Sequence, residues 1–157
     1  MGSLAHEMIL AHFKGEELDL SRYSPVQVDL AENSLISFYE WEKRHTVEPI
    51  FCEKAIVSER LKYGGTLDLY CLLDGVYTLV DFKTGKHVYD EYFVQTSGYK
   101  NLLTENGLPV ERVQILRIGR DETEGFEERH ITNTDKYFSI FVNLLDIYYL
   151  KKDLGWS

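Results

Sequence analysis

Cysteine is scarce in this chain. The 157 residues include only Cys52 and Cys71, and both lie in apolar, strand-like runs without a CxxC spacing. Two thiols cannot form a disulfide framework or supply the four ligands of a structural zinc site or an iron-sulfur cluster. The sequence therefore predicts a protein of a reducing, intracellular compartment that contains no iron-sulfur cluster.

Long hydrophobic runs are also missing. No segment approaches the roughly 18 consecutive apolar residues of a membrane-spanning helix, and we find no targeting leader, internal repeat or linker. With 157 residues, 44% of them hydrophobic, the chain has the size of one compact domain with a sizeable core. We therefore expect residues 1–157 to form a single soluble, cytoplasmic domain with no membrane partner.

Basic residues are fewer than acidic ones. There are 17 Lys and Arg against 26 Asp and Glu, which gives a net charge of −9. Non-specific binding to nucleic acid comes mainly from Lys and Arg, so this balance argues against a protein that coats nucleic acid indiscriminately. It does not exclude an enzyme that acts on nucleic acid, because carboxylates that bind divalent metals count as negative in the same total.

Apolar periodicity and capping residues predict four helices, over residues 4–14, 25–44, 89–105 and 133–152. The second helix has Ser24 as N-cap, Pro25 at its first position and Gln27 three residues after the cap. In the last helix, aromatic residues and leucines recur at helical spacing, and we interpret them as a buried face rather than a platform for stacked bases. These residues are Tyr137, Phe138, Phe141, Leu144, Leu145, Tyr148 and Tyr149.

Five strands are predicted between these helices, over residues 49–58, 65–73, 76–82, 113–118 and 126–131. Asp74-Gly75 forms a tight turn between the second and third strands, so the first three strands form an antiparallel meander. The element order is α-α-β-β-β-α-β-β-α. It indicates an α/β domain with a central mixed β-sheet flanked by helices.

Two aspartates and a lysine lie at the ends of two of these strands. Asp68 and Asp81 are on strands that pair through the Asp74-Gly75 turn, and Lys83 projects on the same side as Asp81 because side chains alternate along a strand. Carboxylate oxygens are ligands that Mg²⁺ and Mn²⁺ prefer. A single aspartate at a strand end is usually a solvated turn residue, but the combination of all three favours a metal-dependent hydrolytic site.

These residues resemble a known family. Gly65-xx-Asp68, Asp81-x-Lys83-Thr84 and Gln95-xxx-Tyr99 are similar to the motifs of the PD-(D/E)XK nuclease superfamily, in particular its RecB-type exonuclease branch. The resemblance implies a restriction-endonuclease-like core that binds one or two Mg²⁺ or Mn²⁺ ions. Asp68, Asp81 and the backbone carbonyl of Phe82 would bind the metal, and Lys83 would orient or help to deprotonate the attacking water.

The same branch carries a metal-binding histidine on its first helix. Ser3-Leu4-Ala5-His6-Glu7 resembles that pattern, so the resemblance assigns His6 as a further metal ligand. Neutral imidazole is an acceptable ligand for Mn²⁺. On sequence alone, the favoured interpretation is that His6 packs on the buried face of its helix, and it is the resemblance that makes it a ligand. His12 is a weaker candidate because it does not share a helical face with His6.

Three further candidates follow from the third helix and from the resemblance. Gln95 and Tyr99 are four residues apart and therefore share a helical face, where the resemblance places them in a DNA-binding cleft; a surface pair is the alternative. Among the scattered basic residues we select Lys86 as a DNA contact at the rim of this cleft. Glu53 matches an acidic residue on the first strand of the family and is a candidate near the metal.

The sequence thus predicts a metal-dependent DNA nuclease, with an exonuclease of recombination, repair or phage-type DNA processing as the leading hypothesis. A bacterial, phage or viral origin fits this hypothesis, as does a homo-oligomer or a larger recombination complex. The alternative is a catalytically silent nuclease fold that binds DNA or serves as a scaffold subunit. A related iron-sulfur nuclease is excluded, because two cysteines cannot supply four thiolates.

Overall fold

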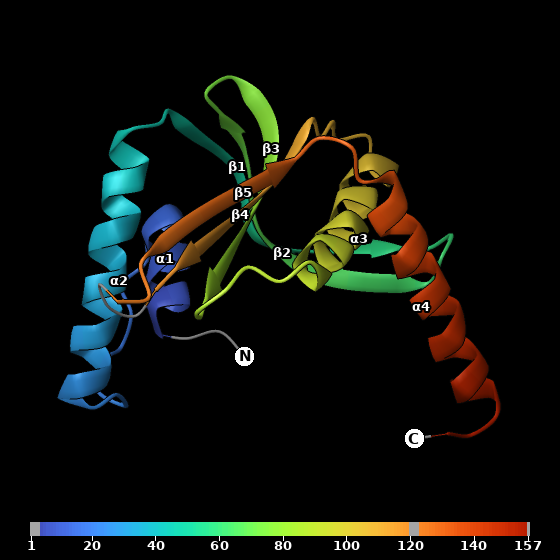
Figure 1. Ribbon diagram of the computed structural model, residues 1–157, viewed down its shortest axis with the longest axis horizontal. Coiled ribbons are helices and arrows are strands. Elements are labelled where there is room, and N and C mark those ends of the chain that lie inside the picture. Colours follow the sequence, from blue (N-terminus) through green and yellow to red (C-terminus); the bar gives the residue numbers. More distant parts are fainter. Residues whose placement is uncertain (1–3, 120–122, 157) are drawn as a thin grey trace.

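A five-stranded sheet forms the centre of the computed structural model, which describes residues 4–119 and 123–156 (Figure 1). The order of helices and strands and the α/β class are those predicted. The elements are α1 (Leu4–Lys14), α2 (Pro25–Lys43), β1 (Val47–Ser58), β2 (Tyr63–Leu73), β3 (Val76–Thr84), α3 (Glu91–Glu105), β4 (Arg112–Ile118), β5 (Phe126–Ile131) and α4 (Asp135–Asp153).

The strands lie side by side in the order β1-β2-β3-β4-β5. β1, β2 and β3 form the predicted antiparallel meander, and Asp74 and Gly75 make its turn at φ values of 50° and 81°. β4 pairs parallel to β3 after the chain has crossed over through α3, and β5 pairs antiparallel to β4 at the edge. The sheet is therefore mixed, and β3 lies at its centre.

The helices form two layers, one on each side of the sheet (Figure 1). α1 and α2 pack together and cover one face, whereas α3 covers the other face and α4 packs on α3. β3 contributes to both layers, because Val80 and Phe82 lie in the core with α1 and α2 while Leu79 lies in the core with α3. Within residues 4–119 and 123–156, no helix has both the length and the hydrophobicity to cross a lipid bilayer.

An aromatic cluster fixes α1 and α2 against β3. The fully buried Phe38 of α2 has its ring centre 5.6 Å from that of Phe13 on α1 and 5.8 Å from that of Phe82 on β3. Edge-to-face contacts of this kind stabilise a core beyond the area that they bury. α2 also begins as predicted, with the Ser24 side chain accepting from the Gln27 amide and the Gln27 side chain accepting from the Ser24 amide.

The prediction of a buried face on the last helix is wrong. None of the residues of α4 is buried, and Leu144 and Tyr148 expose 54% and 58% of their surface. The reason is the position of α4, which packs mainly on α3 and reaches the sheet only at its edge, where the ring centre of Phe141 lies 4.8 Å from that of Tyr63 on β2. The opposite side of the helix has no neighbour in the described chain. Helical spacing of apolar residues identifies a helix but not what covers each of its faces.

We predict that Phe38→Ala lowers the free energy of unfolding by about 3–5 kcal/mol, because it leaves a cavity at the junction of α1, α2 and β3. Ile36→Ala on the same helix is the control: Ile36 is 57% exposed, so its truncation should change stability by less than about 0.5 kcal/mol. Urea unfolding followed by circular dichroism measures both values. Equal losses in the two variants would contradict the described orientation of α2.

Candidate active site

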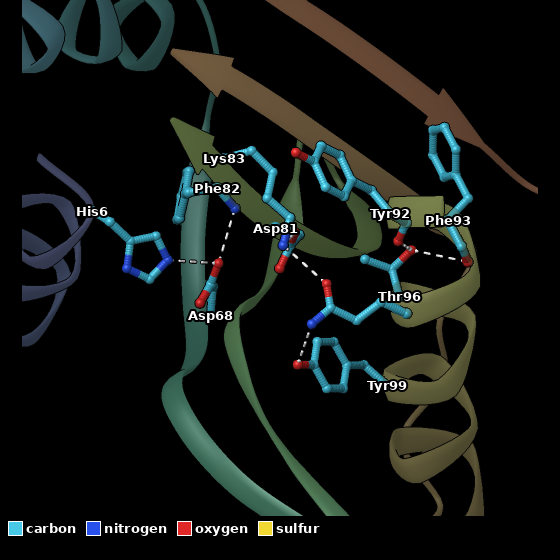
Figure 2. Close-up of polar contacts among 10 residues, drawn as sticks. His6, Asp68, Asp81, Phe82, Lys83, Tyr92, Phe93, Thr96 and Tyr99 are labelled. Atoms are coloured by element: carbon cyan, nitrogen blue, oxygen red, sulfur yellow. Dashed lines mark hydrogen bonds and ion pairs between the residues drawn. The ribbon is translucent and has the colours of Figure 1, made fainter. Parts of the chain in front are cut away.

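The two aspartates meet where β2 and β3 separate. In the antiparallel register, Leu69 of β2 pairs with Val80 of β3, so Asp68 and Asp81 are the next residues on each strand. The amide of Phe82 donates a hydrogen bond of 2.9 Å to Asp68 Oδ2 and ties the two strands together at this point (Figure 2). The turn at Asp74-Gly75 and the strand register therefore bring Asp68 and Asp81 into one site.

Asp81 is the most buried ionisable group of this site. It is 4% exposed, whereas charged residues are almost never fully buried unless they are paired. Burial, followed by the negative charge of Asp68, raises the pKa of Asp81 to about 7, and the Lys83 ammonium opposes this rise. Asp81 therefore exchanges its proton close to neutral pH, unlike an ordinary aspartate.

His6 reaches the site from α1, on the opposite side of the sheet from α3 (Figures 1 and 2). Its Nε2 lies 3.0 Å from Asp68 Oδ2, and its ring meets that of Phe82 edge to face, with 6.5 Å between the ring centres. The hydrogen bond to Asp68 raises the pKa of His6 above its ordinary value, although burial opposes the rise. His6 therefore binds Asp68 in addition to packing against Phe82. Ser3, which belongs to the same sequence pattern, lies outside the described residues.

Lys83 is held by three neighbours. Its Nζ lies 3.1 Å from Asp81 Oδ2, donates to Gln95 Oε1 at 2.9 Å, and lies 4.8 Å from the centre of the Tyr92 ring. The Gln95 amide group in turn donates to the Tyr99 hydroxyl at 3.0 Å. One face of α3 therefore fixes the position of the ammonium group.

Tyr92 is a site residue that the sequence analysis missed. It precedes Gln95 by three positions, so the spacing that paired Gln95 with Tyr99 also places Tyr92 on their face of α3. The buried hydroxyl of Thr96 donates to the Tyr92 carbonyl at 2.9 Å, one turn earlier in α3 (Figure 2). A cation over an aromatic face gains about 0.5–2 kcal/mol, so Tyr92 contributes to holding Lys83.

These residues line one cleft with a volume of about 310 Å³. Thr66, Thr84 and Tyr92 line it together with the predicted residues His6, Asp68, Asp81, Phe82, Lys83, Gln95 and Tyr99. A larger hollow of about 640 Å³ beside α2 has Glu40 as the only ionisable residue in its described lining. The cleft of about 310 Å³ is therefore the candidate active site, because it is the one of the two that brings several ionisable side chains together.

Gly65 explains how Tyr99 fits into the cleft. A Cβ atom at residue 65 would lie 2.5 Å from Cε1 of the Tyr99 ring, closer than carbon atoms approach. Only glycine allows the ring to pack against β2 here. The glycine of the Gly65-xx-Asp68 pattern thus makes room for the tyrosine that binds Gln95.

Two predicted residues lie away from the cleft. Glu53 on β1 adopts a φ of 52° and pairs with Lys14 on α1, and it does not line the cleft in the described structure. Lys86 is exposed in the segment after β3 and is likewise absent from the described lining. The strand position of Glu53 does not bring it to the metal candidates because its side chain turns toward α1.

The carboxylate oxygens of Asp68 and Asp81 in the cleft are the kind of ligand that hard divalent cations prefer. Asp81 Oδ2 is buried without a hydrogen bond, and it faces Lys83 only as an ion pair. A cation between Asp68 and Asp81 would relieve the repulsion that raises the pKa of Asp81. In residues 4–119 and 123–156, however, no three His, Cys, Asp or Glu side chains are arranged to hold a metal ion, and His6 would have to exchange its hydrogen bond to Asp68 for the ion.

Comparisons with known proteins bear on the fold. No family model and no curated protein matches the chain. The crystal structure of a proposed exonuclease from Eubacterium rectale is similar, with a TM-score of 0.66 and 17% identity over 97% of this chain and 67% of that chain. At this identity the similarity shows a shared fold.

Two structures of LHK-Exo are more distant. The alkaline exonuclease from Laribacter hongkongensis has a TM-score of 0.37 and 15% identity over 96% of this chain and 83% of that chain. The complex of LHK-Exo with dAMP has a TM-score of 0.39 and 13% identity over the same shares, 96% and 83%. At these TM-scores neither structure adds to the fold assignment.

We predict that Asp81→Asn stabilises the metal-free protein at pH 8 by about 1–3 kcal/mol, or roughly 3–10 °C in Tm. The folded state raises the pKa of Asp81 above its unfolded value, so the folded protein binds more protons and this group lowers stability as the pH rises from about 4 to about 7. Thermal scans in EDTA at pH 5 and pH 8 measure the effect. An equal or larger gain at pH 5 would contradict the raised pKa.

Proposed function

We propose that this chain is a metal-dependent nuclease that hydrolyses phosphodiester bonds in DNA. The observation that carries the proposal is the convergence of Asp68, Asp81 and Lys83 in one cleft, with Asp81 buried and Lys83 held over it. No structural requirement of the sheet explains two neighbouring carboxylates and an ammonium group at the end of a strand pair. Perturbed ionisable groups of this kind cluster at functional sites.

Asp68, Asp81 and His6 would hold one or two Mg²⁺ or Mn²⁺ ions, with the carbonyl of Phe82 as a further ligand. Such an ion, when bound, supplies positive charge that activates water and neutralises the phosphate. Asp68 accepts from the Phe82 amide, which fixes its carboxylate on the cleft side of β2. Asp81 would ionise fully once a cation offsets the charge of Asp68.

Lys83 would orient the attacking water. An ammonium group has three N–H donors; in this site one binds Gln95 Oε1, and Asp81 Oδ2 lies 3.1 Å from the nitrogen as an ion pair. The ammonium group thus keeps donor capacity for a water molecule or a phosphate oxygen. Lys83 can therefore position the nucleophile and stabilise developing negative charge while it remains protonated.

Gln95, Tyr99 and Tyr92 would keep Lys83 in this position. Gln95 accepts from Lys83 and donates to Tyr99, so the two α3 residues form one hydrogen-bonded chain that ends on the lysine. The Tyr92 ring lies on another side of the ammonium group. A fixed donor contributes more to a transition state than one that must reorganise.

Cleavage from DNA ends is the finer proposal. It is supported by the resemblance of the motifs to the RecB-type branch and by the shared fold with the proposed exonuclease from Eubacterium rectale. The net charge of −9 fits an enzyme that meets DNA through bound cations and a single cleft rather than through a wide basic surface. Recombination, repair or phage-type DNA processing would use such an activity.

We predict that the protein digests labelled DNA with Mg²⁺ or Mn²⁺ and that Asp81→Ala or Lys83→Ala lowers the rate at least about 100-fold, because each variant removes a group from the reacting centre. Lys100→Ala on α3 is the control, since Lys100 does not line the cleft in the described structure. Digestion that survives both cleft substitutions would contradict the site. Cutting of linear but not circular DNA would support an exonuclease, and DNA binding without cutting would support the silent nuclease fold.

We predict that Tyr92→Leu lowers kcat about 3–30-fold with little change in KM, because it removes the aromatic face from the Lys83 ammonium. Tyr92→Phe retains the ring and should stay within about 2-fold of the wild type. Steady-state kinetics on one oligonucleotide compare the three proteins. Equal loss in Tyr92→Phe and Tyr92→Leu would show that the hydroxyl, and not the ring, matters.

A further inference from the structure

The outer face of α4 and its C-cap residue, Leu154, together carry five exposed aliphatic side chains. Ile140, Leu144, Ile147, Leu150 and Leu154 expose 48%, 54%, 47%, 62% and 69% of their surface, respectively, and we name them the α4 stripe. Single exposed apolar residues are common on monomers, but a continuous row of them marks an interaction site. None of the catalytic candidates belongs to this row.

The α4 stripe occupies one side of the helix. Its members are four, three, three and four positions apart, a spacing that keeps them on one helical face. Phe141 lies on a different side of α4, where its ring packs against Gly98 of α3. The helix is therefore apolar toward α3 and apolar again toward the outside.

The spacing of the stripe reads the same in both directions. Ile147 is its centre, with Leu144 and Leu150 at equal distances on either side, and Ile140 and Leu154 at equal distances beyond them. The two polar residues within this face, Asn143 and Lys151, are also equidistant from Ile147. If a second α4 helix packed antiparallel about a two-fold axis that passes through Ile147, each apolar residue would face an apolar residue and each polar residue a polar one.

We propose that a second copy of this chain covers the α4 stripe, with the two α4 helices packed antiparallel about a two-fold axis at Ile147. In this arrangement Ile147 meets its own copy and Ile140 meets Leu154. The apolar spacing fits both directions, but a parallel pair in register would place two Lys151 side chains together, whereas the antiparallel pair places Lys151 beside Asn143. The charge of Lys151 therefore selects the antiparallel pair.

A neighbouring groove extends the same surface. α3 and α4 enclose a groove of about 450 Å³ whose lining includes Val94, Phe141 and Leu145 together with Ile140 and Leu144 of the stripe. In the antiparallel pair, the C-terminal end of the second α4 helix lies opposite Ile140, which lines this groove. The exposed Leu154 and Trp156 of the second copy, at 69% and 64%, supply apolar side chains there.

Nucleic acid is a poorer match for this face. The exposed Tyr148 borders the α4 stripe one turn after Leu144, but a single ring gives no platform for successive bases. Lys151 is the only cation among the seven positions from Ile140 to Leu154 that form the face. A helix of matching apolar pattern covers it better. The proposal does not depend on the nuclease activity.

Sedimentation equilibrium of the wild-type protein, from micromolar to several hundred micromolar, tests the proposal. We expect a dimer whose population rises with concentration, and Ile147→Asp should weaken the dimer at least tenfold because it puts two carboxylates on the axis. Ile36→Asp on α2 is the matched control, since Ile36 is similarly exposed at 57% and should leave the dimer unchanged. A wild-type monomer at all concentrations, or an unaffected Ile147→Asp dimer, would overturn the proposal.

Cross-linking tests the direction of the helices. Ile140→Cys mixed with a differently tagged Leu154→Cys should give a mixed cross-linked dimer with a short thiol cross-linker, whereas either variant alone should give little. The wild type, which retains Cys52 and the buried Cys71, measures the background. Cross-linking of Ile140→Cys to itself would overturn the antiparallel arrangement, and weaker DNA binding by monomeric Ile147→Asp would assign the face to nucleic acid instead.

Discussion

The burial of the Asp81 carboxylate is the constraint on which the site depends. A carboxylate at 4% exposure beside a second carboxylate is unfavourable when ionised, and the pKa of Asp81 rises accordingly. The fold places the Lys83 ammonium 3.1 Å from Asp81 and the Phe82 amide 2.9 Å from Asp68 to offset that cost. What remains is a site that favours an additional positive charge.

The two helical layers meet at this site through β3. Alternation along the strand sends Phe82 into the core with α1 and α2, while Asp81 and Lys83 face α3. Phe82 thereby fixes the layer that carries His6, and Lys83 joins the layer that carries Gln95. Three consecutive residues therefore connect both sides of the sheet to a single cleft.

Much of the fold follows from local sequence patterns. The capping box at Ser24, the turn at Asp74-Gly75 and the period of each helix depend on neighbouring residues, and the predicted order of elements is confirmed. Long-range contacts are less predictable. The aromatic run of α4 has helical spacing whether its faces are covered or not, and the side-chain direction of Glu53 depends on Lys14, which is distant in sequence.

In the candidate site, too, the residues that belong to local motifs could be predicted, whereas those that depend on long-range contacts could not. Asp68, Asp81, Lys83, Gln95 and Tyr99 were predicted from motifs, and the structure brings them together, although their catalytic roles remain a proposal. Tyr92 was missed because no motif includes it, yet its spacing from Gln95 was visible in the sequence. Lys86 lies outside the described lining because the chain leaves the cleft after Thr84.

Titration calorimetry with Mn²⁺ tests the central claim most directly, namely that Asp68 and Asp81 together hold a divalent cation. The wild-type protein should bind one or two ions at pH 8. Asp68→Asn and Asp81→Asn should each weaken that binding at least about tenfold, while Glu53→Gln, away from the cleft, should leave it unchanged. No binding by the folded wild-type protein, or equal binding by all four proteins, would contradict the claim.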